Sequence, residues 1–560
     1  MKDFDVCVIG SGAGGGPIAW EAARAGLAVV VLEKGPWFDE RDFYKDEVTC
    51  NHRRVFRSDY KTEPQVIEEP DASGQWSALP TSDPNSGHDY WNGNCVGGSS
   101  NFMSGHFFRM KPDDFRLLSA FGPIAGANIA DWPIGYEELE PYYTKVETEI
   151  GISGRVVPHK FLEPRSTPDF PYAPTAEHLF AQWVDKAAAE MGYTPLTVAR
   201  AILTRPKAER RSCEYSGFCG SYGCASGAKG SARVALLNRA VATGRCEIRP
   251  RSHVYRIETG ADGRATGVLY YDRDGKAQRV DAKAFVVACQ AIESSRLLLL
   301  SSGPRHPNGL GNNHGQVGRN LVFSAGATGA GHVLLKDYDE ETVRRMKLVG
   351  PFVNRSLQDF YYVDDPALGG RAKGGTIDFV GNSPSFIHRA MPERRDENGE
   401  LVWGREFKRR LETVFRENRV LRFEIFCDWL PNDDCHVTLD PEVKDKWGLP
   451  VSRVRIGHHP HDGRVSQYLV ERARPVMERM GFRNVIANLN GAPTPNLQAG
   501  GCRFGTDPAT SVLDADCRVH DCQNVYVSDG SFMPTGGSVP FTWTIYANAF
   551  RVADRLIASL

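Results

Sequence analysis

Short apolar runs near the start of the chain predict two buried strands, at residues 5–9 and 28–32. Residues 17–25 between them have a helix-like pattern, so this segment predicts a strand–helix–strand unit. Farther along, alternating apolar and polar positions predict strands at 435–440 and 449–456. After Pro460, residues 465–480 are expected to form an amphipathic helix that ends before Gly481.

The first predicted strand leads into a glycine-rich turn. Gly10, Gly12 and Gly15 form the pattern G-x-G-x-x-G, and Glu33 follows the second strand. In this pattern the first glycine permits a tight turn, the second lets the backbone approach a pyrophosphate, and the third allows close helix–strand packing. The helix start offers unpaired N–H groups to phosphate oxygens, and the acidic residue can accept hydrogen bonds from a ribose. The segment therefore predicts a dinucleotide site, although the pattern alone does not separate FAD from NAD.

Composition and charge narrow the classes of partner. The chain has 560 residues, of which 41% are hydrophobic and 24% charged, as in ordinary soluble globular proteins. With 67 Lys and Arg against 69 Asp and Glu, the net charge is −2, which argues against a nucleic-acid partner. No apolar stretch approaches the ~18 residues of a membrane span. The N-terminus runs directly into a strand without a signal-peptide pattern, so a cytoplasmic location is expected for the chain on its own.

Three of the thirteen cysteines lie close together. The odd number, spread over a large chain, argues against a disulfide scaffold, and most are expected to pack as small apolar residues. Cys213, Cys219 and Cys224 are spaced C-x5-C-x4-C in a glycine-rich loop. Such a loop can hold three thiolates around one inorganic cluster, with backbone N–H groups bonded to sulfur. Structural thiols or a disulfide, and a zinc site that would need a fourth ligand, stay open as alternatives.

Several further segments resemble the glucose–methanol–choline (GMC) flavoprotein oxidoreductases. They are a second glycine-rich stretch at 92–101, a strand-and-turn segment at 285–299, and a C-terminal signature at 524–535 with a helix at 542–554. The resemblance spans nearly the whole chain. It implies that the cofactor is FAD. It also implies an α/β plus α+β fold, with a Rossmann-like FAD-binding domain and a discontinuous substrate domain built on an antiparallel sheet.

The resemblance assigns roles to individual residues and segments. Gly10, Gly12, Gly15 and Glu33 would hold the ADP part of FAD, Gly98 and Ser99 would lie along the pyrophosphate or flavin, Val254 would meet the adenine, and Asp529 would meet the ribityl or pyrophosphate region. The FAD-binding domain is expected at 1–45, 85–150, 225–325 and 500–560. The substrate domain, which includes the cysteine loop 213–224, is expected at 46–84, 151–224 and 326–499.

The cysteine loop is similar to one in the catalytic subunits of FAD-dependent bacterial sugar and gluconate dehydrogenases. There, three cysteines hold a [3Fe–4S] cluster that passes flavin electrons onward, although the last spacing here is one residue longer. The resemblance implies a dehydrogenase with a small accessory subunit and a cytochrome or quinone acceptor. Because such a subunit carries the export signal for both chains, it would place this chain in the periplasm.

The catalytic pair of the family departs from its usual form. GMC enzymes use a His as base with a His or Asn partner, and these positions fall on Leu497 and Pro540, which cannot exchange protons. One explanation is a shifted alignment with Gln498 or Asn496 in the site. A second is a replacement base, and the groups considered are Tyr90, the Asp428/Asp433/Asp434 cluster and the histidines His88, His106, His458, His459 and His461. His459, Gln498 and His88 are the catalytic residues we predict. The third is a substrate whose acidic hydroxyl needs no strong base.

These patterns together predict an FAD-dependent dehydrogenase that oxidises an alcohol, sugar or aromatic C–OH substrate by hydride transfer. Electrons would leave through the cysteine loop to an external acceptor. The alternatives are an oxidase that uses oxygen, and a non-catalytic electron-relay flavoprotein that has lost the usual proton-transfer pair.

Overall fold

The structure is a computed structural model. It describes residues 4–52, 56–71, 73–86, 90, 92–324, 326–348, 352–381, 384–489 and 497–560, with the backbone alone at residues 51 and 52. All thirteen cysteines are free thiols. None of the described helices combines the length and apolar character needed to cross a membrane.

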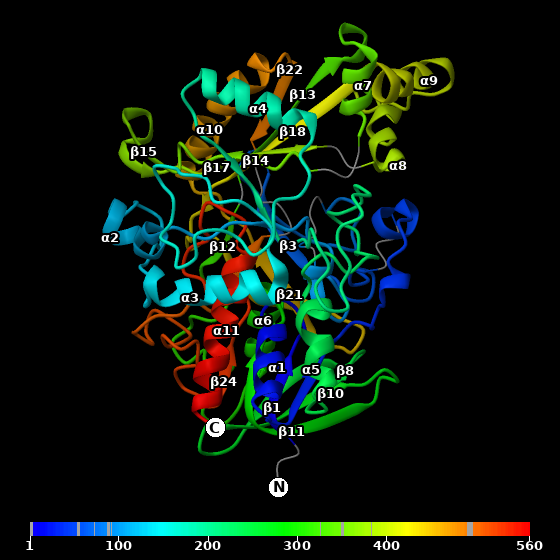
Figure 1. The fold of residues 1–560 in the computed structure, drawn as a ribbon. Helices are drawn as coiled ribbons and strands as arrows, with labels where there is room; N and C mark the ends of the chain where they lie inside the picture. Colours follow the sequence, from blue (N-terminus) through cyan, green and yellow to red (C-terminus); the bar gives the residue numbers. More distant parts are fainter. Residues whose placement is uncertain are drawn as a thin grey trace.

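A mixed sheet of seven strands occupies the lower half of the molecule (Figure 1). Its order is β8-β2-β1-β11-β10-β9, and β24 also pairs with β11. The strands are β1 (Phe4–Ile9), β2 (Val29–Leu32), β8 (Cys246–Arg249), β9 (His253–Thr259), β10 (Ala265–Tyr271), β11 (Ala277–Val287) and β24 (Val525–Val527). Strand β11 pairs antiparallel with β10 in its first half and parallel with β1 in its second half, so it joins a β-meander to the nucleotide-binding strands.

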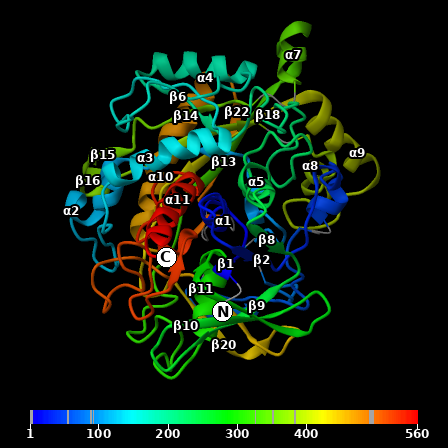
Figure 2. The same ribbon diagram turned by 60° about the horizontal axis from the view of Figure 1, so that its bottom comes forward.

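Helices cover this sheet and continue the strand–helix–strand unit predicted from the sequence. Helix α1 (Gly15–Arg24) connects β1 to β2, which confirms that unit. Helices α1, α5 (Asn238–Ala242) and α11 (Thr542–Ala558) lie side by side on one face in two views (Figures 1 and 2). Residues 6–9 of β1 and all of β2 are buried on both faces, which agrees with their continuous apolar sequences.

An antiparallel sheet of six strands forms the upper half (Figure 1). Its order is β22-β13-β18-β17-β14-β6. The strands are β6 (Pro195–Thr197), β13 (Ala327–Leu334), β14 (Arg355–Leu357), β17 (Thr376–Gly381), β18 (Asn418–Phe426) and β22 (Arg483–Leu489). Helices α4 (Leu179–Glu190) and α10 (Pro460–Arg479) pack against it and against each other. A nucleotide-binding α/β half and an antiparallel half together confirm the predicted fold class.

Four smaller sheets connect the two halves. They are β19 (Asp428–Trp429) with β12 (Leu321–Ser324) and β23 (Gln498–Gly500); β20 (His436–Lys444) with β21 (Pro450–Arg455), β3 (Val66–Pro70) and β4 (Trp76–Pro80); β5 (His106–Phe107) with β7 (Ala199–Arg200); and β15 (Tyr362–Asp365) with β16 (Gly370–Lys373). Strands β20 and β21 confirm the two strands predicted from alternation. The remaining helices are α2 (Leu117–Phe121), α3 (Tyr136–Val146), α6 (Ala291–Leu300), α7 (Glu340–Met346), α8 (Phe386–Ala390) and α9 (Gly404–Glu412).

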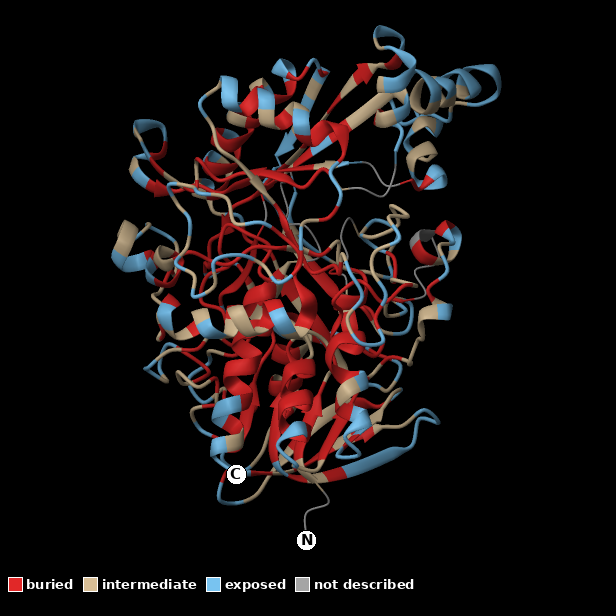
Figure 3. Ribbon diagram, in the orientation of Figure 1, coloured by how far each residue is buried: buried red, intermediate tan, exposed pale blue. Residues whose placement is uncertain are grey.

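Burial is deepest in the nucleotide-binding half, where β1, β2 and the inner faces of α1 and α11 form one continuous core (Figure 3). In contrast, the segment 386–412 is largely exposed and projects at the upper right of Figure 1. Trp403 there is 82% exposed.

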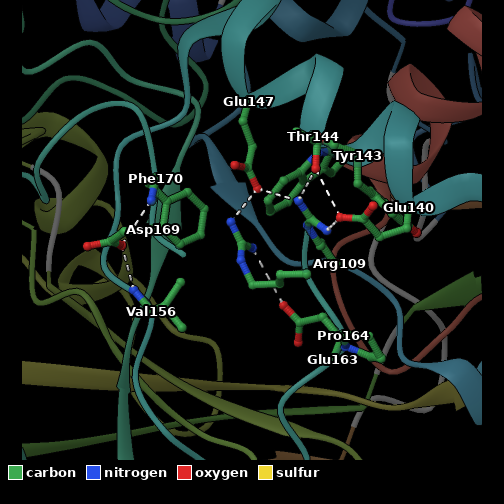
Figure 4. A network of polar contacts seen from close by, with 12 residues as sticks. Arg109, Glu140, Tyr143, Thr144, Glu147, Val156, Glu163, Pro164, Asp169 and Phe170 are labelled. Carbon is green, nitrogen blue, oxygen red and sulfur yellow. Dashed lines mark hydrogen bonds and ion pairs between the residues drawn. The ribbon is translucent and has the colours of Figure 1, made fainter. Parts of the chain in front are cut away.

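A buried arginine fixes the chain just after β5 (Figure 4). The guanidinium of Arg109 donates to Oε1 of Glu140 at 2.9 Å and to Oε1 of Glu147 at 2.7 Å. Glu140 lies on α3 and Glu147 in the turn that follows it. Arg165 also donates to Glu147, so the carboxylate is shared by two arginines. Such charge-assisted pairs are strong and directional, and here they hold β5 against α3.

Candidate functional site

A cavity of about 800 Å³ extends from the carboxyl ends of the nucleotide-binding strands to the antiparallel sheet. A crevice at the carboxyl ends of parallel strands is the usual ligand position in open α/β sheets, and the volume suits a large cofactor with a substrate. Seven of the predicted cofactor residues line it: Gly10, Gly12, Glu33, Gly98, Ser99, Val254 and Asp529.

The three glycines of the first turn have different surroundings. Gly10 has a φ of +95°, and a Cβ there would lie 2.3 Å from the carbonyl oxygen of Ala288. A Cβ on Gly15 would lie 2.1 Å from the carbonyl oxygen of Gly10, so Gly15 packs against the strand instead of lining the cavity. At Gly12 a Cβ would meet nothing within 4 Å. The backbone at Gly12 is therefore open to the cavity, and α1 begins just beyond it at Gly15 without a capping side chain.

Glu33 ends β2 with a buried carboxylate. Its Oε2 accepts from the backbone N–H and the hydroxyl of Ser11 at 3.1 and 2.5 Å, and its Oε1 accepts from the N–H of Gly35 at 2.9 Å. Burial raises the pKa of Glu33 above its usual value, although these hydrogen bonds oppose the shift. Oε1 accepts only one of these three hydrogen bonds, so it has a further lone pair with which Glu33 can accept from a ribose hydroxyl.

Asp529 ties the C-terminal segment to the start of α6. Its Oδ2 accepts from the N–H of Gln290 at 3.0 Å and from the hydroxyl of Ser294 at 2.5 Å, and its Oδ1 accepts from the N–H of Ser531 at 2.9 Å. Burial raises the pKa of this carboxyl group. Gln290 itself has a φ of +79°, a conformation that a non-glycine residue adopts only when its surroundings hold it.

The far end of the cavity combines an apolar wall with a polar one. Leu497, Gln498, Pro540 and Phe541 lie on the apolar wall, and Gln498 is held on β23 opposite Phe323. Thr328, Arg422 and Glu424, from adjacent strands of the six-stranded sheet, lie on the polar wall. Because residues in register on antiparallel strands share a face, this sheet presents a row of hydrogen-bonding groups to the cavity.

Comparison with known proteins adds to this geometry. Sequence models of the N- and C-terminal parts of GMC oxidoreductases match residues 172–324 and 431–549. Paromamine 6'-oxidase of Streptomyces fradiae is 31% identical, over 100% of this chain and 92% of its own length. The chain belongs to the GMC oxidoreductase family.

Two more distant relatives extend the comparison. The gluconate 2-dehydrogenase flavoprotein of Pantoea cypripedii is 27% identical, over 96% of this chain and 90% of its own length. A formate oxidase from Aspergillus oryzae, studied for its FAD modification, has the same fold with a TM-score of 0.64 at 15% identity, over 99% of this chain and 98% of its own. This chain is thus a GMC flavoprotein oxidoreductase that acts on CH–OH groups, and the predicted family is confirmed.

The departure from the GMC catalytic pair persists in the structure. Leu497 and Pro540 both line the cavity. Gln498 lines it as well, with its side chain only 6% exposed. His88 lies outside the described residues. Neither Leu497 nor Pro540 can accept a proton, so the two positions predicted for the family's catalytic pair supply no base to this cavity.

The structure does not bring His459 to the cavity. Its Nδ1 accepts from the N–H of His461, so it caps the start of α10, and its Nε2 lies 2.9 Å from the carbonyl oxygen of Ala125. The helix begins at Pro460 instead of residue 465, because Pro is well suited to the first helical position. Neighbouring His458 packs on the ring of Trp429.

The polar wall was missed at the sequence level. Residues 418–426 carry Arg422 and Glu424 two positions apart, between buried Leu421, Phe423 and Ile425. This alternation is the signal of a strand with one polar face, and it could have indicated the wall. That the polar face meets the cofactor cavity depends on tertiary packing, which the pattern does not contain.

The three predicted cysteine ligands border a second, smaller cavity of about 40 Å³. Cys219 and Phe352 border both cavities. Burial raises the pKa of Cys213 to about 11, whereas at Cys224 the nearby Lys229 and Ser226 outweigh burial and lower the pKa of the thiol. Among the described residues no three His, Cys, Asp or Glu side chains are arranged to hold a single metal ion.

Proposed function

We propose that this chain is an FAD-dependent dehydrogenase that oxidises one hydroxyl group of a polar, hydroxyl-rich substrate such as a sugar or polyol. The observation that carries the proposal is the single cavity, with Gly12, Glu33 and Val254 at one end and the Thr328, Arg422 and Glu424 wall at the other. Relatives named for paromamine and gluconate support a polar substrate. An aromatic alcohol, which would suit the apolar wall of Leu497 and Phe541, is the competing substrate class.

The residues present fit FAD. The open backbone at Gly12 and the start of α1 suit a pyrophosphate, and the carboxylate of Glu33 suits a ribose. When bound, FAD supplies a two-electron acceptor for the hydride of the substrate carbon. The protein supplies the orientation: Arg422 and Glu424 can bind substrate hydroxyls, while Leu497 and Phe541 exclude water from the reacting end.

A substrate panel with the purified holoenzyme tests this function. Under anaerobic conditions, a sugar or polyol substrate should bleach the visible absorbance of the oxidised flavin. The Glu424→Gln variant should need a higher concentration of that substrate and should leave bleaching by a simple apolar alcohol unchanged. The exposed Glu406→Gln variant on α9 is the matched control and should behave as wild type. Bleaching by aromatic alcohols alone would overturn the sugar or polyol assignment.

We further propose that electrons leave the flavin through an iron–sulfur cluster held by the cysteine loop. A polynuclear cluster takes one thiolate at each iron, so its ligands stand farther apart than those of one ion. Cys213, Cys219 and Cys224 surround one small cavity whose wall is shared with the flavin cavity, which suits a relay beside the cofactor. The acceptor would be a cytochrome or quinone. An accessory subunit would carry the chain to the periplasm.

Iron and acid-labile sulfide per chain, measured on anaerobically purified protein, test the cluster. The Cys219→Ser variant should lose both and keep its FAD. The Cys246→Ala variant, which removes a buried thiol on β8, is the control and should keep both. Iron near zero in the wild-type protein would remove the cluster from the proposal.

An oxidase is the second candidate function, favoured by the relative at 31% identity that is named an oxidase. The two functions can be distinguished by the electron acceptor that the enzyme uses. A dehydrogenase turns over with ferricyanide and produces little hydrogen peroxide in air, whereas an oxidase produces one hydrogen peroxide for each substrate oxidised.

A further inference from the structure

The cavity holds a histidine–carboxylate pair that the family signature does not include. We propose that His106 takes the hydroxyl proton of the substrate and that Asp378 positions its ring. This inference rests on the proposed oxidation of an alcohol in the cavity. His106 would then supply the proton acceptor, a role that the side chains of Leu497 and Pro540 cannot fill.

His106 lies on the short strand β5, opposite Arg200 on β7. Both residues line the same cavity as Leu497, Gln498 and Pro540. The His106 side chain is 9% exposed, so most of it is enclosed, and the residue borders the cavity. The buried Arg109 clamp, three residues along the chain, fixes the strand that carries the ring.

Asp378 reaches His106 from the other half of the molecule. Its side chain is completely buried, and its Oδ2 forms an ion-pair contact with Nδ1 of the His106 ring. In the register of the sheet, Asp378 on β17 stands opposite Glu424 on β18, and Glu424 stands opposite Thr328 on β13. Asp378 therefore belongs to the row that faces the cavity.

The contact at Nδ1 decides which nitrogen can react. A carboxylate at one ring nitrogen favours the tautomer with its proton there, which leaves Nε2 as the acceptor. Nε2 points away from Asp378, on the side of the ring that is not occupied by the carboxylate. Asp378 from β17 contacts the ring, Arg200 from β7 stands opposite His106, and the charged Glu424 and Arg422 from β18 line the same cavity. The Arg200 guanidinium is engaged by Asn354 and by the carbonyl oxygen of Ser104.

The other described histidines on the cavity wall are less suited to this role. His253 lies beside Val254, at the end assigned to adenine, with its ring stacked on Trp447. His388 lies on α8, and its backbone N–H donates to Glu47. Among the described histidines that line the cavity, His106 is the one in contact with a carboxylate.

The reaction balances with one base. The alcohol carbon would give up its hydrogen as a hydride, with its two electrons, and bound FAD would supply the acceptor. The hydroxyl oxygen gives its proton to Nε2 of His106, and the product is a carbonyl compound. The resulting imidazolium is stabilised by Asp378 and loses its proton to solvent after the product leaves. General-base assistance of this kind contributes roughly 10²- to 10⁴-fold in rate.

Anaerobic stopped-flow reduction of the holoenzyme tests the inference. His106→Gln and His106→Asn should retain FAD and its visible spectrum but reduce it roughly 10²- to 10⁴-fold more slowly. Asp378→Asn should also slow reduction. In wild type the rate should rise with pH to a plateau as the base loses its proton, and this rise should vanish in both His106 variants. Added imidazole should restore part of the rate in His106→Ala, a rescue that a purely structural role does not give.

His459→Asn is the matched control, because Asn can replace the helix cap at that position, and it should reduce FAD at the wild-type rate. His106 variants that keep the wild-type rate and pH profile would overturn the inference while leaving the proposed function intact. A wild-type flavin that no alcohol, sugar or polyol reduces would overturn the proposed function itself. If His106→Gln loses FAD, then His106→Asn and the imidazole rescue decide the question.

Discussion

Gly10 and Gly12 stand two residues apart, yet an added methyl group would meet different surroundings at each. At Gly10 it would press into the backbone of Ala288, just beyond β11, and force a left-handed conformation on a residue with a side chain. At Gly12 it would project into open space that belongs to the cofactor cavity. The first glycine thus serves the fold and the second serves the ligand.

We expect Gly12→Ala to fold normally and to weaken FAD binding by more than about tenfold, which corresponds to about 1.4 kcal/mol. Gly10→Ala should lower the thermal midpoint of the apoprotein, because the clash and the positive φ exist without FAD. FAD titration by fluorescence and thermal unfolding of the apoprotein measure the two effects. Equal loss of stability in both variants would contradict this division of roles.

The cofactor residues could be predicted from the sequence because the first turn works locally. Gly10, Gly12 and Glu33 act within one strand–helix–strand unit, and all three line the cavity. The pair of His106 and Asp378 could not be predicted in this way. It joins a two-residue strand to the middle of a distant sheet, and no spacing in the sequence records that contact.

At the scale of single elements, α4 begins with an unusual cap. The Nδ1 of His178 accepts from the N–H of Phe180 at 3.2 Å, and its Nε2 lies 3.2 Å from the carbonyl oxygen of Met346. Both contacts are satisfied by a neutral ring that carries its proton on Nε2. Burial, with a smaller effect from Arg419, lowers the pKa of His178 to about 4.

This cap predicts a loss of stability in mild acid. Because the folded pKa of about 4 lies below the usual 6.5, the contribution is complete above pH 6.5 and is lost as the pH falls towards 4. The loss should reach about 3 kcal/mol, at about 1.4 kcal/mol per pKa unit. His178→Asn keeps a capping side chain without the titration, so its thermal midpoint should fall less between pH 7 and 4. Parallel curves for the two proteins would contradict the prediction.

Elements with strong local patterns were predicted well. The strands β20 and β21 and most of α10 were predicted from the spacing of apolar residues and from the Pro and Gly residues that flank them. The predicted helix lacks the first five residues of α10, because Pro460 can interrupt regular structure but is also well suited to the first position of a helix.

For the whole molecule, a partly buried charge cluster links the nucleotide-binding sheet to the four-stranded sheet. Glu63 accepts from Lys34, just beyond β2, at 2.9 Å, and from Lys446, in the turn between β20 and β21, at 2.8 Å. Burial alone would raise the pKa of Glu63, but the two lysines outweigh it and lower the pKa to about 2.

The cluster predicts how the assembly responds to stronger acid. The folded pKa of Glu63 lies below its usual value of 4.5, so its contribution is present above pH 4.5 and is lost as the pH falls to about 2. Glu63→Gln should be less stable than wild type at neutral pH by up to about 3 kcal/mol. In thermal unfolding followed by flavin fluorescence, the two proteins should converge as the pH falls to about 2. A difference that persists at low pH would assign the effect to packing.

The arrangement of whole segments was the hardest to predict. Residues 436–455 were expected on the substrate side, yet β20 and β21 pack against α6, which follows β11 of the nucleotide-binding sheet. Strand β21 also pairs in parallel with β3, nearly four hundred residues earlier in the chain. Such pairings depend on the completed tertiary structure, so the domain boundaries given above stay a prediction.

The side chains of Cys219 and Phe352 form a partition with one face toward each cavity. A reagent that alkylates Cys219 would therefore add bulk to a wall of the chamber where the alcohol is oxidised. Inhibition by such a reagent would therefore affect both cavities. If bound substrate protects Cys219 from alkylation, the reagent reaches the thiol through the larger cavity; if it does not, the reagent reaches the thiol through the smaller one.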